Sequence, residues 1–334
     1  MRPPAPSPPD APDAPDATPA LARDLAAPGA PESQWLAVAL ARAFGPSALA
    51  VIHYGSHAQR QNAPRESARD FFVIVDRYGP AYRALARTVG TPFRPLTATL
   101  LAHVLAPNVI AVRVATSGGA ALPKCVVLSR RDLRRLAGPR APDHFVRARL
   151  FQHVQLLWTR DAAYRAEVEA LVADVRRRTM DWVRPWLPPR FDAECYCRRL
   201  LEVSFRAEIR PERATRVEEL LAAQRTTLVP LYAGLLDELA RGGVLVREGA
   251  EYALASSVGR LDALRVSLYL RRSLVRATVR WLKYVALYEG WLDYIVRKLS
   301  RHGAPQEPLG PRERRWPLLF LWPKVIRFFR NRAR

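Results

Sequence analysis

The chain contains little cysteine and almost no lysine. Its three cysteines, Cys125, Cys195 and Cys197, form neither a metal-ligand spacing nor an even set for a disulfide framework. We therefore expect reduced thiols and an intracellular protein. Arginine carries nearly all of the positive charge, because the only lysines are Lys124, Lys283, Lys298 and Lys324. Lys124 is therefore unusual in its apolar surroundings.

Large apolar residues are nearly missing from the first 33 residues, which repeat Ala-Pro-Asp without periodicity. This composition predicts a disordered tail over residues 1–33 and lacks the apolar core of a secretory signal. Asp10, Asp13 and Asp16 argue against a mitochondrial transit peptide, because such peptides are poor in acids.

The charge balance is strongly basic, with a formal net charge of +22 and a pI near 11. Such an excess attracts partners that carry phosphate, and both nucleic acid and an anionic membrane surface fit. The hydrophobic fraction of 49% excludes a wholly disordered chain.

The first half of the chain alternates helical and strand patterns. We expect strands at 48–54, 70–76, 108–115 and 124–129, with a hairpin turn at 116–119 between the last two. Helices are expected at 34–44, 80–105 with a break near Pro92 and Pro95, 130–137, 144–158 and 161–178. The pattern predicts an α+β fold with a mixed sheet flanked by helices.

A new unit is predicted to begin after the proline-rich segment 185–189. Helices at 192–207, 215–223 and 228–241 precede a hairpin at 242–254, which is typical of a winged-helix-like module. The predicted organisation is a tail at 1–33, a nucleotidyltransferase domain at 34–180, a helical winged-helix-like domain at 181–258 and a basic helical membrane-associating region at 259–334.

The last region contains two basic patterns. From 260 to 302 the sequence is helical, and five cations share one face, with no acid between Asp262 and Glu289: Arg265, Arg272, Arg276, Arg280 and Lys283. This face is either solvated or turned to phosphates. Residues 316–334 mix rings with cations, as interfacial membrane anchors do, although a helix docked on the core is the alternative: Trp316, Phe320, Trp322, Lys324, Arg327, Phe328, Phe329 and Arg330.

The most informative stretch joins a small-residue turn to an acidic strand. Tyr54, Gly55 and Ser56 end one strand, and Gly lets backbone N–H groups and a hydroxyl approach a triphosphate. Asp70 begins the next strand, where a carboxylate holds Mg²⁺ against phosphate oxygens. Common nucleotidyltransferases have a second acid two residues earlier, where this chain has Ala68. Asp76 lies about 20 Å further along the strand, so we place it at the strand's end as a weaker metal candidate.

Several separated segments resemble the mitochondrial translocator assembly and maintenance proteins, a family of nucleotidyltransferase-fold phosphatidate cytidylyltransferases. The Tyr-Gly-Ser turn at 54–56 and the Asp-Phe to Val-Asp strand at 70–76 look like family motifs, and the family also lacks the acid at position 68. Segments 124–129, 148–150, 203–210 and 231–252 are similar in the same order. The chain departs from the family at His57 and Arg77.

The resemblance implies a divergent, bacterial-type phosphatidate cytidylyltransferase that transfers CMP from CTP to phosphatidic acid, forming CDP-diacylglycerol in phospholipid biosynthesis. Asp70 and Glu208 would hold Mg²⁺ and, with Lys124, form the catalytic set. Arg149 and Arg210 would bind the nucleotide with residues 54–56. The expected location is the cytoplasm, peripherally on the inner face of the cell membrane. The alternatives are a nucleotidyltransferase acting on RNA, protein or a small molecule, and a non-catalytic nucleic-acid-binding protein, which the resemblance does not favour.

Overall fold

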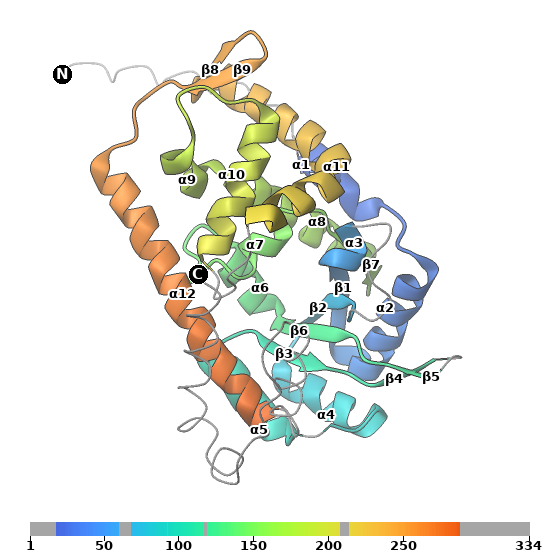
Figure 1. Ribbon diagram of the computed structural model, residues 1–334. Coiled ribbons are helices and arrows are strands. Elements are labelled where there is room, and N and C mark those ends of the chain that lie inside the picture. The colour runs from blue at the N-terminus through green and yellow to red at the C-terminus, as the bar shows by residue number, and fades with distance from the viewer. Residues whose placement is uncertain (1–17, 60–67, 92, 117–118, 208–213, 288–334) are drawn as a thin grey trace, which may run out of the picture.

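The computed structural model describes residues 18–59, 68–91, 93–116, 119–207 and 214–287. Its centre is a five-stranded mixed sheet, as predicted, and the fold class is α+β (Figure 1). The strands lie in the order β3 (Asn108–Ala111), β6 (Lys124–Ser129), β2 (Asp70–Val75), β1 (Ala48–Tyr54) and β7 (Gln155–Thr159). Only the β2 and β6 pair is parallel. A separate small hairpin, β4 (Val114–Thr116) and β5 (Gly119–Ala121), lies between β3 and β6 in the sequence. Its turn is where the sequence predicts one, but the predicted strand 108–115 is divided between β3 and β4.

Helices cover both faces of the sheet, which explains why β1 and β2 are apolar on both sides. One face packs on α2 (Pro31–Phe44), α4 (Tyr78–Thr88) and α5 (Pro95–Val104). The other face carries α6 (Arg130–Ala137), α7 (Arg147–Leu150) and α8 (Ala162–Arg177). Ser129 caps α6 by accepting a hydrogen bond from the Asp132 N–H.

A helical unit follows α9 (Met180–Val183) and is built on α10 (Ala193–Arg206) and α11 (Ala214–Arg241). The predicted break between 223 and 228 is wrong, because α11 runs through Pro230. Leu228 and Tyr232 are fully buried on either side of that proline, and this packing offsets its cost of about 3 kcal/mol in a helix interior. The hairpin of β8 (Leu245–Glu248) and β9 (Glu251–Leu254) is present as predicted.

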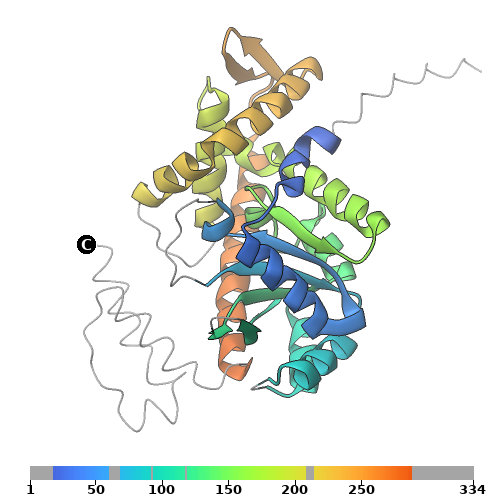
Figure 2. The ribbon, with the colours of Figure 1, turned by 90° about the vertical axis from the view of Figure 1, so that its right-hand side faces the viewer.

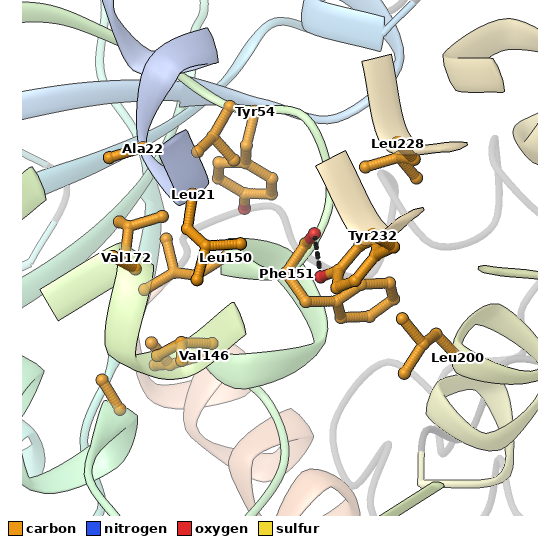
Figure 3. Packing of buried hydrophobic residues seen from close by; sticks show 14 of the residues in the cluster. Leu21, Ala22, Tyr54, Val146, Leu150, Phe151, Val172, Leu200, Leu228 and Tyr232 are labelled. Carbon is orange, nitrogen blue, oxygen red and sulfur yellow. Dashed lines mark hydrogen bonds between the residues drawn. The ribbon is translucent and has the colours of Figure 1, made fainter. Parts of the chain in front are cut away.

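The sheet and the helical unit share a core across the predicted boundary at residue 180. One buried cluster contains Phe72 and Ile74 of the sheet together with Tyr196 and Tyr232 of the helical unit. Figure 3 shows Tyr232 donating a hydrogen bond of 2.8 Å to the Phe151 carbonyl, beside Leu150 and Leu200. The described residues on the two sides of position 180 therefore share one packed core.

The predicted tail extends too far, because residues 18–33 are ordered parts of the fold. Helix α1 (Thr18–Leu21) and a 3₁₀ turn, Arg23–Ala26, bury Leu21 and Leu25 against α8 and β7. Asp24 forms a buried ion pair with Arg176. The averaged Ala, Pro and Asp composition hides this short apolar anchor. Helix α2 also begins at Pro31 rather than at residue 34, with proline in its first turn, where a missing N–H costs nothing.

The predicted helix at 144–158 is also wrong. Only α7 is helical there, and the segment continues as strand β7, which pairs with β1 from His53 to Ala50. A short apolar run such as 154–158 does not distinguish a buried strand from a helix by periodicity. The unpaired edge of β1 decides the outcome, because only a strand satisfies its backbone groups.

The long helix α12 (Arg260–Leu287) lies along one flank of the molecule, from the β8–β9 end down to α5 (Figures 1 and 2). Three of the five cations on the predicted basic face point into the protein, so this part of the face is neither solvated nor turned to phosphates. Arg276 and Arg280 bind the fully buried carboxylate of Asp143 at 2.9 and 2.8 Å. The Lys283 ammonium donates to the carbonyls of Leu101, Leu105 and Pro107.

Candidate functional site

The turn and the acidic strand predicted from the sequence meet at one end of the sheet. Gly55 directly follows β1, while Asp70 and Lys124 are the first residues of β2 and β6. In the register, Asp70 pairs with Tyr54 on one side and with Lys124 on the other. The antiparallel β1–β2 pair and the parallel β2–β6 pair therefore bring a turn, a carboxylate and an ammonium together.

Gly55 is required at this position for two physical reasons. Its φ is +80°, a left-handed conformation that other residues adopt at a cost. A Cβ added there would also lie 2.8 Å from Oδ2 of Asp70, closer than real Cβ atoms approach another atom. The Asp70 carboxylate therefore occupies the space that a side chain at position 55 would need. Ser56 then begins the short helix α3 (Ser56–Gln59), whose Ala58 and Gln59 N–H groups donate to the Gly55 carbonyl at 3.0 Å.

Asp70 and Lys124 form an ion pair that water can reach. Lys124 Nζ lies 3.4 Å from Asp70 Oδ1, and their side chains are 32% and 23% exposed. A carboxylate and an ammonium at this spacing can bind a metal–phosphate group together, because the carboxylate attracts the cation and the ammonium attracts phosphate oxygens. The pair has the chemistry that the sequence predicts for it.

Contacts from other elements fix the starts of β2 and β6, which carry Asp70 and Lys124. Arg69, one residue before Asp70, donates two hydrogen bonds to the Glu32 carboxylate on α2 at 2.7 and 2.6 Å. The Arg69 carbonyl accepts the Lys124 N–H at 2.8 Å. These contacts hold the start of β2 against both α2 and β6, so the positions of Asp70 and Lys124 depend on packed elements and not on a loop alone.

Tyr54 lies beneath the turn as a packing residue. It is 5% exposed, and its ring centroid lies 4.6 Å from that of Phe72. Figure 3 shows its ring among Leu21, Leu150 and other members of the buried cluster. A side chain in this position supports the Gly55–Ser56 turn from the core side, so a packing role fits Tyr54 better than the nucleotide contact predicted for it.

Arg149 lies on α7 near the same end of the molecule. Its guanidinium stands 3.8 Å from the centroid of the Phe145 ring, and its Nη1 donates to the Phe145 carbonyl at 2.7 Å. Three residues further on, Gln152 accepts a hydrogen bond of 3.0 Å from Gln59 of α3. The α7 segment is thus tied to the helix that follows the turn.

The sequence reasoning missed this glutamine link. Gln224 of α11 donates to Gln152 at 3.3 Å and also accepts the His153 N–H at 3.0 Å. Gln59, Gln152 and Gln224 therefore connect the turn to the helical unit. They come from three distant segments, and no spacing in the sequence indicates that they meet.

His53, one residue before Tyr54, is a second residue that the sequence reasoning missed. It is 1% exposed, and its Nδ1 lies 3.0 Å from Oε1 of Gln155. Its Nε2 is buried and makes no hydrogen bond to another residue. Burial lowers the pKa of His53 to about 4, so the ring is neutral at pH 7.

Asp76 does not belong to the same site. It follows the far end of β2, where it is exposed and lies 3.5 Å from Arg77. The length of β2, about 20 Å, separates it from Asp70, so one metal ion cannot contact both carboxylates. Asp76 lies at the strand's end, as predicted, and stays a separate and weaker metal candidate there. Glu208, Arg210 and the C-terminal residues 316–330 lie outside the described residues.

Asp70 is thus the one predicted metal ligand that the structure places at this end of the sheet. Within the described ranges, no group of three or more His, Cys, Asp and Glu residues is arranged around a common metal position. Mg²⁺ fits such a place, because it commonly takes one or two protein carboxylates and completes its shell with phosphate oxygens and water.

Comparison of the chain with protein-family models and with curated protein sequences found no match.

Proposed function

We propose that the protein is a phosphatidate cytidylyltransferase with a nucleotidyltransferase fold and a winged-helix-like helical unit. The observation that carries the proposal is the close packing of the side-chain-free Gly55 turn and the Asp70 carboxylate, whose Oδ1 lies 3.4 Å from Lys124 Nζ. A close backbone approach, a metal-binding acid and a phosphate-binding cation are the parts that nucleotidyl transfer needs.

The proposal gives each of these residues a role. The Gly55–Ser56 turn would receive the triphosphate through backbone N–H groups and the serine hydroxyl. Asp70, together with Glu208, would hold Mg²⁺, which when bound neutralises the charge on the phosphates. Lys124 and Arg149 would stabilise the phosphate oxygens, with Arg210 as a further candidate.

The reaction is a displacement at phosphorus. A phosphate oxygen of phosphatidic acid bonds to the α-phosphorus of CTP, and the bond from that phosphorus to the β-phosphate oxygen breaks. Pyrophosphate leaves with the electron pair, and CDP-diacylglycerol is formed. The attacking oxygen is already anionic, so the chain needs no buried general base for this step. Binding and charge stabilisation carry the catalysis.

A nucleotidyltransferase acting on RNA, protein or a small molecule would use the same residues with another acceptor. The non-catalytic nucleic-acid-binding alternative has less support, because Arg276, Arg280 and Lys283 are engaged inside the fold. Lipid is the acceptor that we favour, and the protein would then work peripherally on the inner face of the cell membrane. No helix within the described ranges has the length and apolarity needed to cross a bilayer.

The test is to incubate the protein with CTP labelled at the α-phosphate, Mg²⁺ and phosphatidate vesicles. We expect label in CDP-diacylglycerol, and about a hundredfold or greater loss with Asp70→Asn. Asp76→Asn is the matched control, because it removes a carboxylate from the other end of the same strand, and it should retain activity.

Two results would contradict the proposal. One is the absence of labelled lipid with the wild-type protein, and the other is equal product from the wild type and Asp70→Asn. Label transferred to RNA, protein or a small phosphate, but not to lipid, would keep the reaction class and replace the acceptor.

A further inference from the structure

The outer face of α12 carries an apolar stripe that the sequence reasoning did not notice. Five large apolar side chains on this helix are between 46% and 70% exposed: Leu261, Leu264, Leu268, Val275 and Val279. At 3.6 residues per turn, the five fall within an arc of about 60° and extend over about 27 Å. We call these five residues the α12 stripe.

The stripe is directed away from the protein, because the residues that anchor α12 lie on another side of the helix. Leu270, Ser273 and Arg280 are buried, and on the helical projection they lie about 100–180° from Leu261 and Val279. The Ser273 hydroxyl accepts the His144 N–H at 2.9 Å and donates to the Ala207 carbonyl at 3.3 Å. The anchoring side is thus fixed by hydrogen bonds, and the helix cannot rotate to bury the stripe without breaking them.

Arginines flank the stripe on both sides. On the helical projection, Arg265 and Arg272 lie along one border and Arg260 and Arg271 along the other, and all four are exposed. Asp262, which pairs with Arg265 at 3.4 Å, is the only acid in the sequence of α12. An apolar stripe bordered by cations is the surface of a helix that lies in the plane of an anionic membrane.

We propose that the α12 stripe is the face by which the protein docks on an anionic lipid surface. The inference rests on the proposed function, because that function requires a lipid surface. The position of the contact is inferred from the exposure of the stripe and the charge of its borders. Leu and Val side chains would enter the boundary between headgroups and acyl chains, while the flanking arginines would bind lipid phosphates.

Two other occupants fit the surface less well. A second copy of the chain would bring the same arginines against each other, because a two-fold interface pairs one surface with itself. Nucleic acid would match the charge but not the aliphatic stripe, since bases stack on aromatic rings rather than on Leu and Val.

The proposal is tested by co-sedimentation of the full-length protein with vesicles in the absence of nucleotide. One set contains phosphatidylcholine alone, and the other contains phosphatidylcholine mixed with phosphatidylglycerol. We expect binding to the mixed vesicles and about a tenfold or greater loss with the double variant Leu264→Gln, Leu268→Gln. Val244→Gln, Val246→Gln is the matched control, because these valines are 46% and 49% exposed at the β8–β9 hairpin.

The charge of the border gives a second, independent variant. Arg271→Gln, Arg272→Gln should weaken binding to the mixed vesicles by about tenfold, and this effect should shrink as salt is raised. Circular dichroism should give the same thermal transition for all variants, because none of the changed side chains is buried.

Wild-type binding by the stripe variant would overturn the proposal, as would equal binding to neutral and anionic vesicles. Light scattering that shows a wild-type dimer, abolished by the stripe variant, would assign the face to a second copy instead. Asp70→Asn should bind vesicles like the wild type. If the catalytic assay fails, vesicle binding by the α12 stripe can still be observed. If vesicle binding fails, the proposal for the nucleotide site is not affected, so the two failures can be told apart.

Discussion

Two ion pairs of this protein each join an aspartate to a cationic side chain, but one pair is buried and the other is reached by water. Asp24 accepts hydrogen bonds from Arg176 and lies 2.9 Å from Nδ1 of His153, and the Arg176 guanidinium is wholly buried. Asp70 faces Lys124 at 3.4 Å, and both side chains are partly exposed. The buried pair stabilises the fold, whereas the partly exposed pair can be reached by a ligand.

The difference comes from how completely each partner is satisfied. Arg176 also donates to the carbonyls of Leu21, Leu150 and Gln152, so its position ties α1, α7 and α8 together. Buried charges are tolerated only with such complete hydrogen bonding. Asp70 needs fewer hydrogen bonds from the protein, because water reaches its carboxylate. A metal ion or phosphate group can replace that water.

The largest expected effect is therefore on the buried pair. Arg176→Ala leaves the Asp24 carboxylate buried without its main partner and should lower the free energy of unfolding by about 3–5 kcal/mol. Urea unfolding followed by circular dichroism measures this change. Arg178→Ala is the control, because Arg178 pairs with Asp174 while about two-fifths exposed. A loss below about 1 kcal/mol for Arg176→Ala would show that the pair is not structural.

The second effect concerns pH and the buried His53. The folded protein keeps this ring neutral down to a pKa of about 4, whereas the unfolded chain takes up the proton near 6.5. Stability is therefore lost as the pH falls from about 6.5 to 4, by about 3 kcal/mol at most. Unfolding midpoints at pH 7 and pH 4.5 should differ less in His53→Gln than in the wild type. An unchanged difference would mean that His53 is protonated in the folded state.

The third prediction separates backbone strain at Gly55 from the displacement of the Asp70 carboxylate. Gly55→Ala should cost about 1–2 kcal/mol for the left-handed backbone and should also displace the Asp70 carboxylate, reducing nucleotidyl transfer by about tenfold or more. Gly243→Ala is the matched control, because Gly243 has φ +72° and nothing within 4 Å of an added Cβ. It should show the stability loss alone. Equal activity of the two variants would remove Gly55 from the site.

The smallest expected effect is on the stability of the exposed pair. Asp70→Asn should change the free energy of unfolding by no more than about 1 kcal/mol, because partly exposed ion pairs contribute little. Chemical denaturation of this variant beside Arg176→Ala tests the comparison directly. A loss as large as that of Arg176→Ala would show that Asp70 is a structural residue.

Much of the site could be predicted because its signals are local. The Gly55 turn, the apolar strand after Asp70 and the strand that begins at Lys124 each depend on a few neighbouring residues, and the structure contains all three. Segments whose structure is set by distant partners were predicted wrongly. Residues 154–158 become a strand because β1 offers an edge, and residues 18–26 are ordered because Arg176 binds Asp24.

Helix α12 shows the same limit for function. Periodicity places Arg265, Arg276 and Arg280 on one side of a helix, but it does not say which side the protein covers. Asp143, more than 100 residues earlier, binds two of these arginines and so fixes the rotation of the helix. The exposed stripe is the consequence, and only the structure reveals it.

The central claim is that the end of the sheet at Gly55, Asp70 and Lys124 binds a metal-bound nucleotide. Titration calorimetry with CTP, in the presence and absence of Mg²⁺, tests it without any acceptor. We expect binding by the wild type and by Asp76→Asn only when Mg²⁺ is present, and about a tenfold or greater loss of affinity with Asp70→Asn. Equal, Mg²⁺-independent binding by all three proteins, or no binding by any of them, would contradict the account.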